Sequence, residues 1–367
     1  MKRTLALIFV LLFAVSLFAG CNKKDNASGS DLNKDGTYEL ALVTDVGNID
    51  DQSFNQSCYE AVVQFGTTYG IDYAYYRPSE DSTEARVETM KTAIDKGAKT
   101  IVCPGYLFED AVYEMQTAYP NVNFILIDGE PHTPDYATYH TEKNVYCILY
   151  KEEQAGYLAG YAAVKDGYTE LGFCGGMDVP AVIRYGYGFV QGADAAAAEM
   201  GVDVNIKYYY CGSFGPSDDL QTKMSSWYTE GTQVVFTCGG SLYLSVVAAA
   251  DAANAKVIGV DVDQSYVSDK IITSAMKQLK TSTMLALKAL NDNGGTWPAE
   301  YAGVTAVLGA AEDCVGLPTD ADSWRFTKFT VDEYTALFNK LVSGEIVVSN
   351  DTSKAPATTR AVVDYQS

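Results

Sequence analysis

The chain has 367 residues, of which 26 are Lys or Arg and 47 are Asp or Glu, so its formal net charge at pH 7 is −21. A protein this acidic is repelled by nucleic-acid phosphates, which excludes nucleic acid as a partner. Hydrophobic residues make up 47% of the chain, as in globular proteins, and the length exceeds what one core usually supports, so we expect two domains. The 12% aromatic content leaves rings free to stack against a flat ligand.

Residues 1–20 have the layout of a secretion signal. Two cations precede an apolar run at 5–18 that contains a single serine, and small residues follow it up to Cys21. The run is shorter than the roughly 20 residues of a membrane-spanning helix. The terminus resembles a bacterial lipoprotein signal, with Phe18 where leucine is usual. We therefore expect cleavage before Cys21, lipidation of its thiol and a flexible tether at 21–37, which would hold the protein on the extracytoplasmic side of the cell membrane.

A plain secretory signal and a single anchoring helix are the alternatives at this terminus.

The eight cysteines are scattered and contain no CxxC pair, so we expect them to act as small buried hydrophobes. His132 and His140 are the only histidines, and both fall in one proline-containing loop that we expect at the surface. The sequence therefore contains no zinc signature and no obvious catalytic triad, and we expect neither a metal nor a cofactor.

Short apolar runs alternate with stretches of helical periodicity from residue 38 onward. Such alternation predicts an α/β fold with parallel sheets and right-handed crossovers. In the first half we expect strands at 38–44, 71–76, 99–103 and 124–128, and helices at 53–68, about 87–94 and 109–119. A capping box formed by Ser53 and Gln56 is expected to begin the first of these helices.

The pattern then restarts, and each half ends on a strand whose last residue is aspartate, Asp128 in the first and Asp261 in the second. In the second half we expect strands at 171–174, 205–210, 234–237 and 257–261, and helices at 152–164, 181–200, 218–229 and 242–253. We interpret the repeat as two similar doubly wound parallel-sheet lobes joined by a hinge.

The rest of the chain is expected to return and complete both lobes. The first lobe would comprise 38–148 and about 264–303, and the second 149–263 and about 304–348. A helix at 274–290 would pack on the first lobe. A segment at 305–308 and a helix at 331–342 would pack on the second. The polar tail, 349–367, is expected to be loosely held.

Candidate binding residues follow the predicted strands, because ligands of open parallel sheets bind beyond the carboxyl ends of the strands. Asp45, Asp128 and Asp261 each come at or just after a strand, and Gly240 follows another. Carboxylates at these points accept hydrogen bonds from a polyhydroxylated or amide-bearing molecule. Any one of them alone could equally be a helix cap or a turn residue. Their convergence from both halves favours a ligand site between the lobes.

The segment TDVGNIDDQSFNQ, residues 44–56, carries the sharpest signal. Here the chain resembles the basic membrane protein family of ABC-transporter substrate-binding lipoproteins, whose best known members are purine nucleoside receptors. The resemblance covers nearly all of the mature chain. It continues through LIDGE at 126–130, YGFVQG at 187–192, CGG at 238–240, VIGVDVDQ at 257–264 and ITSAMK at 272–277.

The resemblance implies a monomeric Venus-flytrap protein, of the periplasmic-binding-protein type I kind, that closes on a nucleoside and delivers it to a membrane permease. A purine nucleoside is the expected ligand. Phe54 would stack on the base, with Phe189 or Phe214 on the opposite side. The roles implied for the polar residues are reading of the base edge by Asp45, Asn55 and Asp128, acceptance from the ribose hydroxyls by Asp261, room for the ligand at Gly240 and a charged hydrogen bond from Lys277.

Structural roles remain open for several of these residues. Phe54 could anchor its helix in the core, Asn55 could be an exposed early-helix residue, and Lys277 could be a solvated charge. Phe189 lies in a helix that the core needs, so core packing is favoured for it.

Two other functions remain as alternatives. The aspartates at 44–51 superficially resemble the calcium-binding segment of nucleoside hydrolases, but Val43 stands where a first aspartate is expected. A binding protein for a sugar or another small polar solute would also use aromatic rings and aspartates, and mainly the family motif separates it from a nucleoside receptor.

Overall fold

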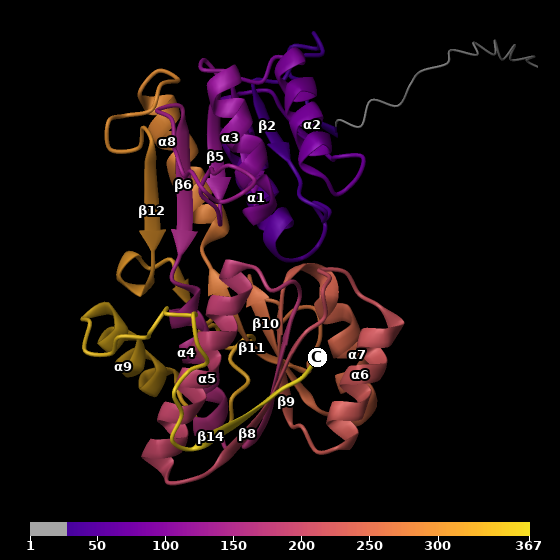
Figure 1. Cartoon of the computed structure of the whole chain (residues 1–367), viewed down its shortest axis with the longest axis vertical. Helices are drawn as coiled ribbons and strands as arrows, with labels where there is room; N and C mark the ends of the chain where they lie inside the picture. The colour runs from indigo at the N-terminus through magenta and orange to yellow at the C-terminus, as the bar shows by residue number, and fades with distance from the viewer. Residues whose placement is uncertain (1–27) are drawn as a thin grey trace, which may run out of the picture.

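The computed structural model describes residues 28–367, so the expected signal at 1–20 and the lipidation site Cys21 lie outside the described residues. Two lobes, each built around one twisted sheet with helices on both faces, lie end to end (Figure 1). The prediction of an α/β fold with two lobes of similar construction is confirmed. Among residues 28–367, every helix is too short or too polar to cross a membrane.

The first lobe contains a seven-stranded sheet in which only β1 is antiparallel to its neighbour. In spatial order its strands are β1 (Ser28–Ser30), β3 (Tyr73–Tyr76), β2 (Leu40–Val43), β4 (Thr100–Pro104), β5 (Asn123–Ile127), β6 (Val145–Tyr150) and β12 (Val304–Leu308). Its helices are α1 (Phe54–Tyr69), α2 (Thr83–Asp95), η1 (Tyr106–Phe108), α3 (Glu109–Ala118) and α8 (Leu279–Asp292).

Alternate residues of the interior strand β2 point to opposite faces of this sheet. Leu40 and Leu42 pack in the cluster that contains residues of α1 and α8. Ala41 and Val43 pack instead with residues of α2 and α3. The strand is therefore buried on both faces, which explains its continuous apolar run.

The second lobe contains another seven-stranded sheet, in which β13 is antiparallel to its neighbour. In spatial order its strands are β13 (Val315–Gly316), β11 (Ile271–Lys277), β10 (Lys256–Asp261), β9 (Val234–Cys238), β7 (Glu170–Gly175), β8 (Val204–Tyr210) and β14 (Ala361–Tyr365). Its helices are α4 (Glu152–Lys165), α5 (Pro180–Met200), α6 (Asp218–Thr229), η2 (Gly240–Leu242), α7 (Tyr243–Ala253), η3 (Ala310–Glu312) and α9 (Val331–Val342).

Glycines let α4 and α5 pack backbone to backbone. A Cβ atom at Gly188 would lie 1.9 Å from the carbonyl oxygen of Glu153, and one at Gly156 would lie 2.1 Å from that of Tyr185. In α5, Gly188 and Gly192 therefore serve packing against α4.

The chain passes between the lobes at the ends of β6, β11 and β12. Backbone hydrogen bonds tie these crossings together, from Lys151 N to Leu308 O at 2.8 Å and from Gln278 N to Cys314 O at 2.9 Å. The hinge is thus a bundle of neighbouring strand ends, and it lies next to the strand-end residues singled out in the sequence.

Two of the returning segments differ from expectation. Residues 271–277 form β11 of the second sheet, and the helix expected at 274–290 begins only at Leu279. Residues 304–308 form β12, which pairs in parallel with β6 in the first sheet, so their assignment to the second lobe was wrong. The sequence analysis also missed β6 itself. Short apolar runs buried on both sides carry no periodicity that separates strand from helix.

The tail is held in the fold, contrary to expectation. Strand β14 pairs in parallel with β8 along its whole length. One carboxylate oxygen of Asp194 in α5 accepts hydrogen bonds from the backbone N–H groups of Thr359, Arg360 and Ala361 at 2.6–2.8 Å. These bonds fix the chain just before the strand begins.

The cysteines behave as expected, whereas one histidine does not. All seven cysteines of the described range are free, and all except Cys211 are buried. His140 is exposed, but His132 is only 2% exposed and its Nε2 lies 3.0 Å from a carboxylate oxygen of Glu109. Tyr136 stacks on its ring. The prediction of a surface position was therefore wrong for His132.

Candidate functional site

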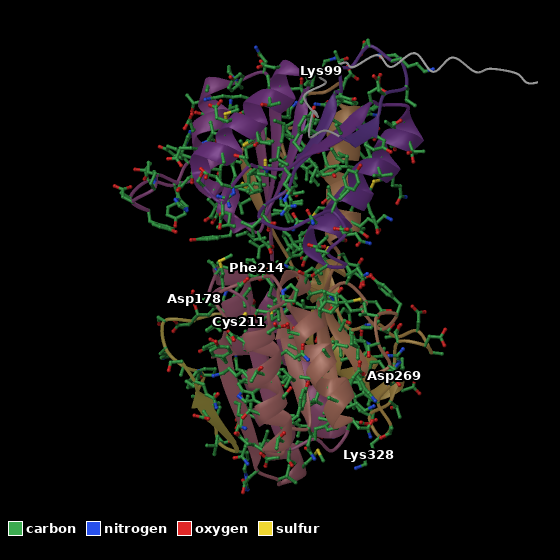
Figure 2. All side chains as sticks on the ribbon, turned by 90° about the vertical axis from the view of Figure 1, so that its right-hand side faces the viewer. Lys99, Asp178, Cys211, Phe214, Asp269 and Lys328 are labelled. Atoms are coloured by element: carbon green, nitrogen blue, oxygen red, sulfur yellow. The ribbon has the colours of Figure 1, made fainter. Side chains whose placement is uncertain are left out.

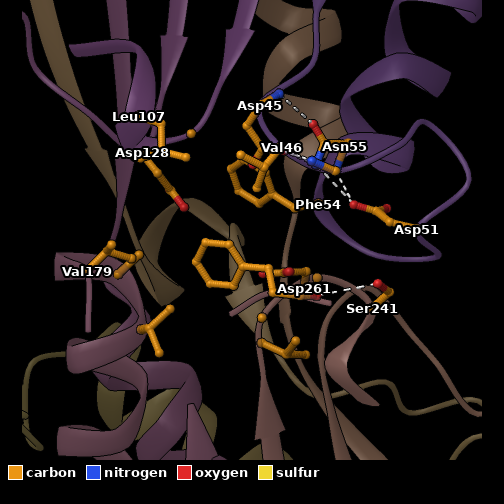
Figure 3. Close-up of a pocket in the computed structure, with 18 of the residues that line it drawn as sticks. Asp45, Val46, Asp51, Phe54, Asn55, Leu107, Asp128, Val179, Ser241 and Asp261 are labelled. Atoms are coloured by element: carbon orange, nitrogen blue, oxygen red, sulfur yellow. Dashed lines mark hydrogen bonds between the residues drawn. The ribbon is translucent and has the colours of Figure 1, made fainter. Parts of the chain in front are cut away.

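A cavity of about 510 Å³ lies between the lobes, at the carboxyl ends of strands from both sheets. Figure 3 shows residues of the two lobes facing one another across it. Of the nine residues singled out in the sequence, eight line this cavity: Asp45, Phe54, Asn55, Asp128, Phe214, Gly240, Asp261 and Lys277. The ninth, Phe189, does not.

Phe189 belongs to the core of the second lobe. Its side chain is fully buried, and its ring centroid lies 5.4 Å from that of Phe236 and 6.5 Å from that of Phe173. Its proposed contact with a ligand is therefore excluded, and of the two candidate rings Phe214 is the one that lines the cavity.

Asp45 is held in place immediately after β2. Its Oδ1 accepts hydrogen bonds from Gly47 N at 2.6 Å and from Asn55 Nδ2 at 2.9 Å. Its Oδ2 has no donor among the residues that the structure describes, so it is free to accept from a ligand. Burial raises the pKa of the Asp45 carboxyl to about 6.

Asn55 orients its neighbours and has no free amide hydrogen for a ligand. Its Nδ2 donates to Asp45 Oδ1 and, at 3.1 Å, to Asp51 Oδ2, and its Oδ1 accepts from Asp45 N at 3.3 Å (Figure 3). An amide nitrogen has only two hydrogens, and both are used here. The side chain is buried, which excludes the alternative of an exposed early-helix residue.

Asp51 caps α1, in place of the expected capping box. Its carboxylate accepts from the backbone N–H groups of Ser53, Asn55 and Gln56 at 2.9–3.1 Å, whereas Ser53 makes no capping bond to the helix with its side chain. Such bonds favour the ionised carboxylate, but burial outweighs them and raises the pKa of Asp51. The sequence missed this role because Asp51 lies two residues before the expected cap.

Lys277 lies at the centre of a buried acidic cluster at the end of β11. Its ammonium group donates to Asp128 Oδ2 and lies 3.5 Å from Glu152 Oε1 and 3.8 Å from Asp261 Oδ1. Burial alone would lower the pKa of Lys277, but these three carboxylates raise it above its usual value, so the side chain is charged at neutral pH. Lys277 is therefore not the solvated charge considered as an alternative.

Glu152 is a member of this cluster that the sequence analysis missed. Its fully buried carboxylate accepts a hydrogen bond from Arg184 Nε at 2.6 Å and faces Lys277 on its other side. In the sequence it is an ordinary acidic residue in the first turn of a helix, where such residues stabilise the helix dipole. Only the packing of α4 against α5 and β11 brings it next to Arg184 and Lys277.

Asp128 and Asp261 occupy equivalent places after β5 and at the end of β10. Both have left-handed backbones, with φ of 61° and 65°. Non-glycine residues rarely adopt this conformation, although aspartate tolerates it better than most, and such strain concentrates at functional sites. Burial raises the pKa of Asp128 to about 7, although Lys277 opposes the shift, and burial also raises the pKa of Asp261. Asp128 Oδ1 is buried and has no hydrogen-bond partner among residues 28–367.

Aromatic rings enter the cavity from both lobes. Phe54, the first residue of α1, points into the space between the lobes, and the ammonium group of Lys277 lies 4.8 Å from its ring centroid (Figure 3). Phe214 lies on the side of the second lobe that faces the first (Figure 2). A flat ligand between these residues would meet a ring from each lobe.

Glycines make room for Phe214 and not primarily for a ligand. A Cβ atom would lie 2.4 Å from the Phe214 ring if placed at Gly176, and 2.7 Å from it if placed at Gly239. At Gly240 it would lie 2.8 Å from the Phe214 carbonyl oxygen. These glycines form a platform that sets the position of the ring. Gly240, expected to make room for a ligand, does so mainly for this residue.

The rest of the wall combines an apolar face with an excess of acid. Val179, Val182 and Tyr185, at the start of α5, provide apolar lining that the sequence analysis did not single out. Within the part of the chain that the structure describes, two lining residues are cationic, Arg77 and Lys277, against five carboxylates: Asp45, Asp50, Asp51, Asp128 and Asp261. The cavity therefore offers mostly hydrogen-bond acceptors and disfavours an anionic ligand.

Comparison with known proteins agrees with this architecture. Residues 38–352 match a family described as "ABC transporter substrate-binding protein PnrA-like". The ABC transporter nucleoside-binding protein BmpA of Lactococcus lactis is 29% identical over 303 residues, which cover 76% of this chain and 82% of that protein. The CD4+ T-cell-stimulating antigen of Listeria innocua is 28% identical over 366 residues, 95% of this chain and 98% of its own.

Solved structures show the same fold. A solute-binding protein of an ABC transporter system from Aeropyrum pernix aligns with a TM-score of 0.72 at 22% identity, over 85% of this chain and 94% of its own. A solute-binding protein from Conexibacter woesei aligns with a TM-score of 0.64 at 20% identity, over 85% of this chain and 98% of its own. Both have the periplasmic-binding-protein type I fold. The related proteins are ABC substrate-binding proteins, which are not enzymes, in agreement with the expectation for this chain. The chain belongs to the PnrA-like, or basic membrane protein, family of ABC-transporter substrate-binding proteins.

Proposed function

We propose that the protein captures a nucleoside, with a purine expected, between its lobes and delivers it to the permease of an ABC importer. The observation that carries this proposal is the pair of rings, Phe54 and Phe214, that line one cavity from opposite lobes above a set of buried acceptors. A base between two rings gains roughly 1–3 kcal/mol per stacking contact. The nucleoside-binding relative from Lactococcus lactis supports the same ligand class.

The hydrogen-bonding groups divide into two subsites. Asp45, held by Asn55, has its free Oδ2 near Phe54 and Gly105, and we assign it to an N–H group of the base. Asp261 and Lys277 belong to the ribose subsite, where a carboxylate accepts from hydroxyl groups. Because Asp128 is bonded to Lys277, we place it in this subsite as well, in place of the expected base edge.

The charge of the cavity favours a nucleoside over a nucleotide. A phosphate would approach five lining carboxylates and only two cations, of which Lys277 is already surrounded by acid. Repulsion in this partly desolvated space costs more than in water. A neutral nucleoside avoids this cost and supplies hydroxyl and N–H donors to the acceptors.

The cellular setting is part of the same proposal. Substrate-binding proteins of this family act outside the cytoplasm and hand their ligand to permease subunits. We infer that Cys21 carries a lipid that anchors the protein to the membrane, and that the protein works as a monomer.

Mass spectrometry tests the ligand class without a prior choice of compound. The protein is purified without refolding, denatured, and the released small molecule is identified. A nucleoside released in near-stoichiometric amount is the expected result. Release of a sugar or another non-aromatic solute would overturn the nucleoside assignment and leave the binding function intact.

A further inference from the structure

The turn before α1, formed by Gln52 and Ser53, bonds directly to the opposite lobe. Ser53 Oγ donates to Asp261 Oδ2 at 2.6 Å. Gln264 Nε2 donates to the Gln52 carbonyl oxygen at 3.0 Å, and the Tyr243 hydroxyl donates to Gln52 Oε1 at 3.2 Å. Three hydrogen bonds from two consecutive residues therefore cross from the first lobe to the second.

The local backbone makes these two residues available. Because Asp51 caps α1, the Ser53 hydroxyl has no role in the helix and can reach Asp261. Gln52 has a left-handed backbone with φ of 52°, which a non-glycine residue adopts only where the surroundings enforce it. The hydrogen bonds from the second lobe to its carbonyl oxygen and to its side chain hold Gln52 in this conformation.

The receiving side of the second lobe is rigid. Gln264 is fully buried, its Oε1 accepts from Val260 N at 3.0 Å, and its own N–H donates to Ser274 Oγ at 3.0 Å. A Cβ atom at Gly259 would lie 2.6 Å from Gln264 Oε1, so this side chain fits closely against β10. Its side-chain N–H group is thus presented to the Gln52 carbonyl oxygen in a fixed position.

We propose that Gln52 and Ser53 form a closure latch that holds the lobes together around the bound ligand and slows its release. None of Gln52, Ser53, Tyr243 and Gln264 lines the cavity. The latch therefore stabilises the closed arrangement without contacting the ligand. It also fixes two ligand-facing side chains, because Ser53 precedes Phe54 and binds Asp261.

The proposal of a latch rests on the proposed function only for the identity of the ligand that the closed lobes hold. The bonds join the two lobes of the chain itself, so the population of the closed arrangement can be measured with no ligand present. An open arrangement separates these donors from their acceptors. The geometry therefore links the two Gln52 bonds to closure alone, whereas the Ser53 bond both joins the lobes and orients the Asp261 carboxylate.

Two conservative variants remove single latch bonds, Ser53→Ala and Tyr243→Phe. Release of radiolabelled inosine is timed after a chase with unlabelled inosine. Each variant is expected to release inosine about 3- to 10-fold faster, as the loss of one hydrogen bond predicts. The rate of association should change by less than about twofold. Tyr228→Phe is the matched control, since its hydroxyl bonds to Lys256 O within the second lobe, and it should release inosine at the wild-type rate.

Small-angle X-ray scattering of the unliganded proteins is the second measurement. The Ser53→Ala/Tyr243→Phe double variant is expected to have a larger radius of gyration than the wild type and the Tyr228→Phe control. Failure of inosine to bind the wild type would contradict the proposed ligand, while the scattering comparison would still test the latch. Unchanged scattering, or unchanged release rates in variants that bind inosine, would overturn the latch.

Discussion

The ammonium group of Lys277, at the end of a strand in the second sheet, donates a hydrogen bond to the carboxylate of Asp128, which follows a strand in the first sheet. One buried cation thus joins the two lobes at the floor of the cavity. It also balances Glu152 and Asp261, which lie within 4 Å of it. The ligand site and the hinge consequently share the same charged group.

Replacing Lys277 by methionine is expected to reduce both stability and binding. The change leaves three buried carboxylates without their common cation, and breaking a buried pair typically costs about 3–5 kcal/mol. The loss should be larger at pH 8 than at pH 5, because the raised pKa of Asp128 lets it take up a proton at the lower pH. Urea unfolding at both pH values measures the loss of stability.

Lys288→Met is the control for the lysine substitution, because Lys288 is half-exposed on α8 and forms only a surface ion pair with Asp292. Its effect on the free energy of unfolding should stay within about 1 kcal/mol. An equally small effect of Lys277→Met would contradict the role assigned to the cluster.

Gly176→Ala is expected to weaken ligand binding through Phe214. The new Cβ atom would lie 2.4 Å from the Phe214 ring, so the ring must move. We expect a loss of affinity of about 10-fold, within the range for one stacking contact. In a Phe214→Ala background the same substitution should have little further effect, because the clash is gone. Calorimetric titration with inosine measures the four affinities.

Gly215→Ala is the matched control, in the loop that carries Phe214 itself. Its Cβ atom would approach nothing closer than Ser213 Oγ at 3.7 Å, and wild-type affinity is expected. If Gly176→Ala also binds like the wild type, the glycine platform does not position the ring.

Phe189 and Phe214 are expected to separate stability from binding. Phe189→Ala should lower the free energy of unfolding by about 3–5 kcal/mol, as for other buried aromatic residues. The milder Phe189→Leu should fold and bind inosine within about twofold of the wild type. Phe214→Ala should do the reverse, with a modest loss of stability and a clear loss of affinity. A loss of affinity for inosine in folded Phe189→Leu would show that Phe189 contributes to the ligand site.

Asp45→Asn is expected to stabilise the protein near neutral pH while it weakens binding. The folded protein keeps a proton on Asp45 up to about pH 6, whereas the unfolded chain releases it near 3.8. This carboxyl therefore lowers stability progressively as the pH rises from about 4 to about 6, and the penalty stays constant above that. Asparagine cannot ionise and avoids the penalty.

The expected gain for Asp45→Asn is roughly 1–2 kcal/mol at pH 7, since residual solvent at the cavity reduces the full effect of burial, and close to zero at pH 4. Thermal unfolding across this range measures it. A gain that is the same at pH 4 and pH 7 would show that ionisation of Asp45 is not its source.

Much of the fold and of the site was predictable because the chemistry sits at strand ends. Buried parallel strands are short continuous apolar runs, and a parallel sheet brings their carboxyl ends to one edge. Asp45, Asp128 and Asp261 follow from that rule alone. The alternation of strands and helices then places all three at one cavity.

Some errors arose where the decisive contacts are distant in sequence, and one arose from local hydrogen bonds that residue types do not reveal. Residues 271–277 become a strand through pairing with β10, and Glu152 joins the site only through Arg184 and Lys277. Asn55 was expected to read the base, yet its amide hydrogens are taken by two aspartates that lie 4 and 10 residues away. Local sequence gives residue types but not which hydrogen bonds are already satisfied.

Calorimetric titration of the wild type and of Asp261→Ala with inosine tests the central claim most directly. The account predicts one inosine bound per wild-type chain, inosine monophosphate at least about 100-fold weaker, no heat from galactose, and no inosine binding by folded Asp261→Ala. Asp251→Ala, which changes an exposed aspartate of α7, should bind like the wild type. Binding of galactose but not inosine, or undiminished binding of inosine by Asp261→Ala, would contradict it.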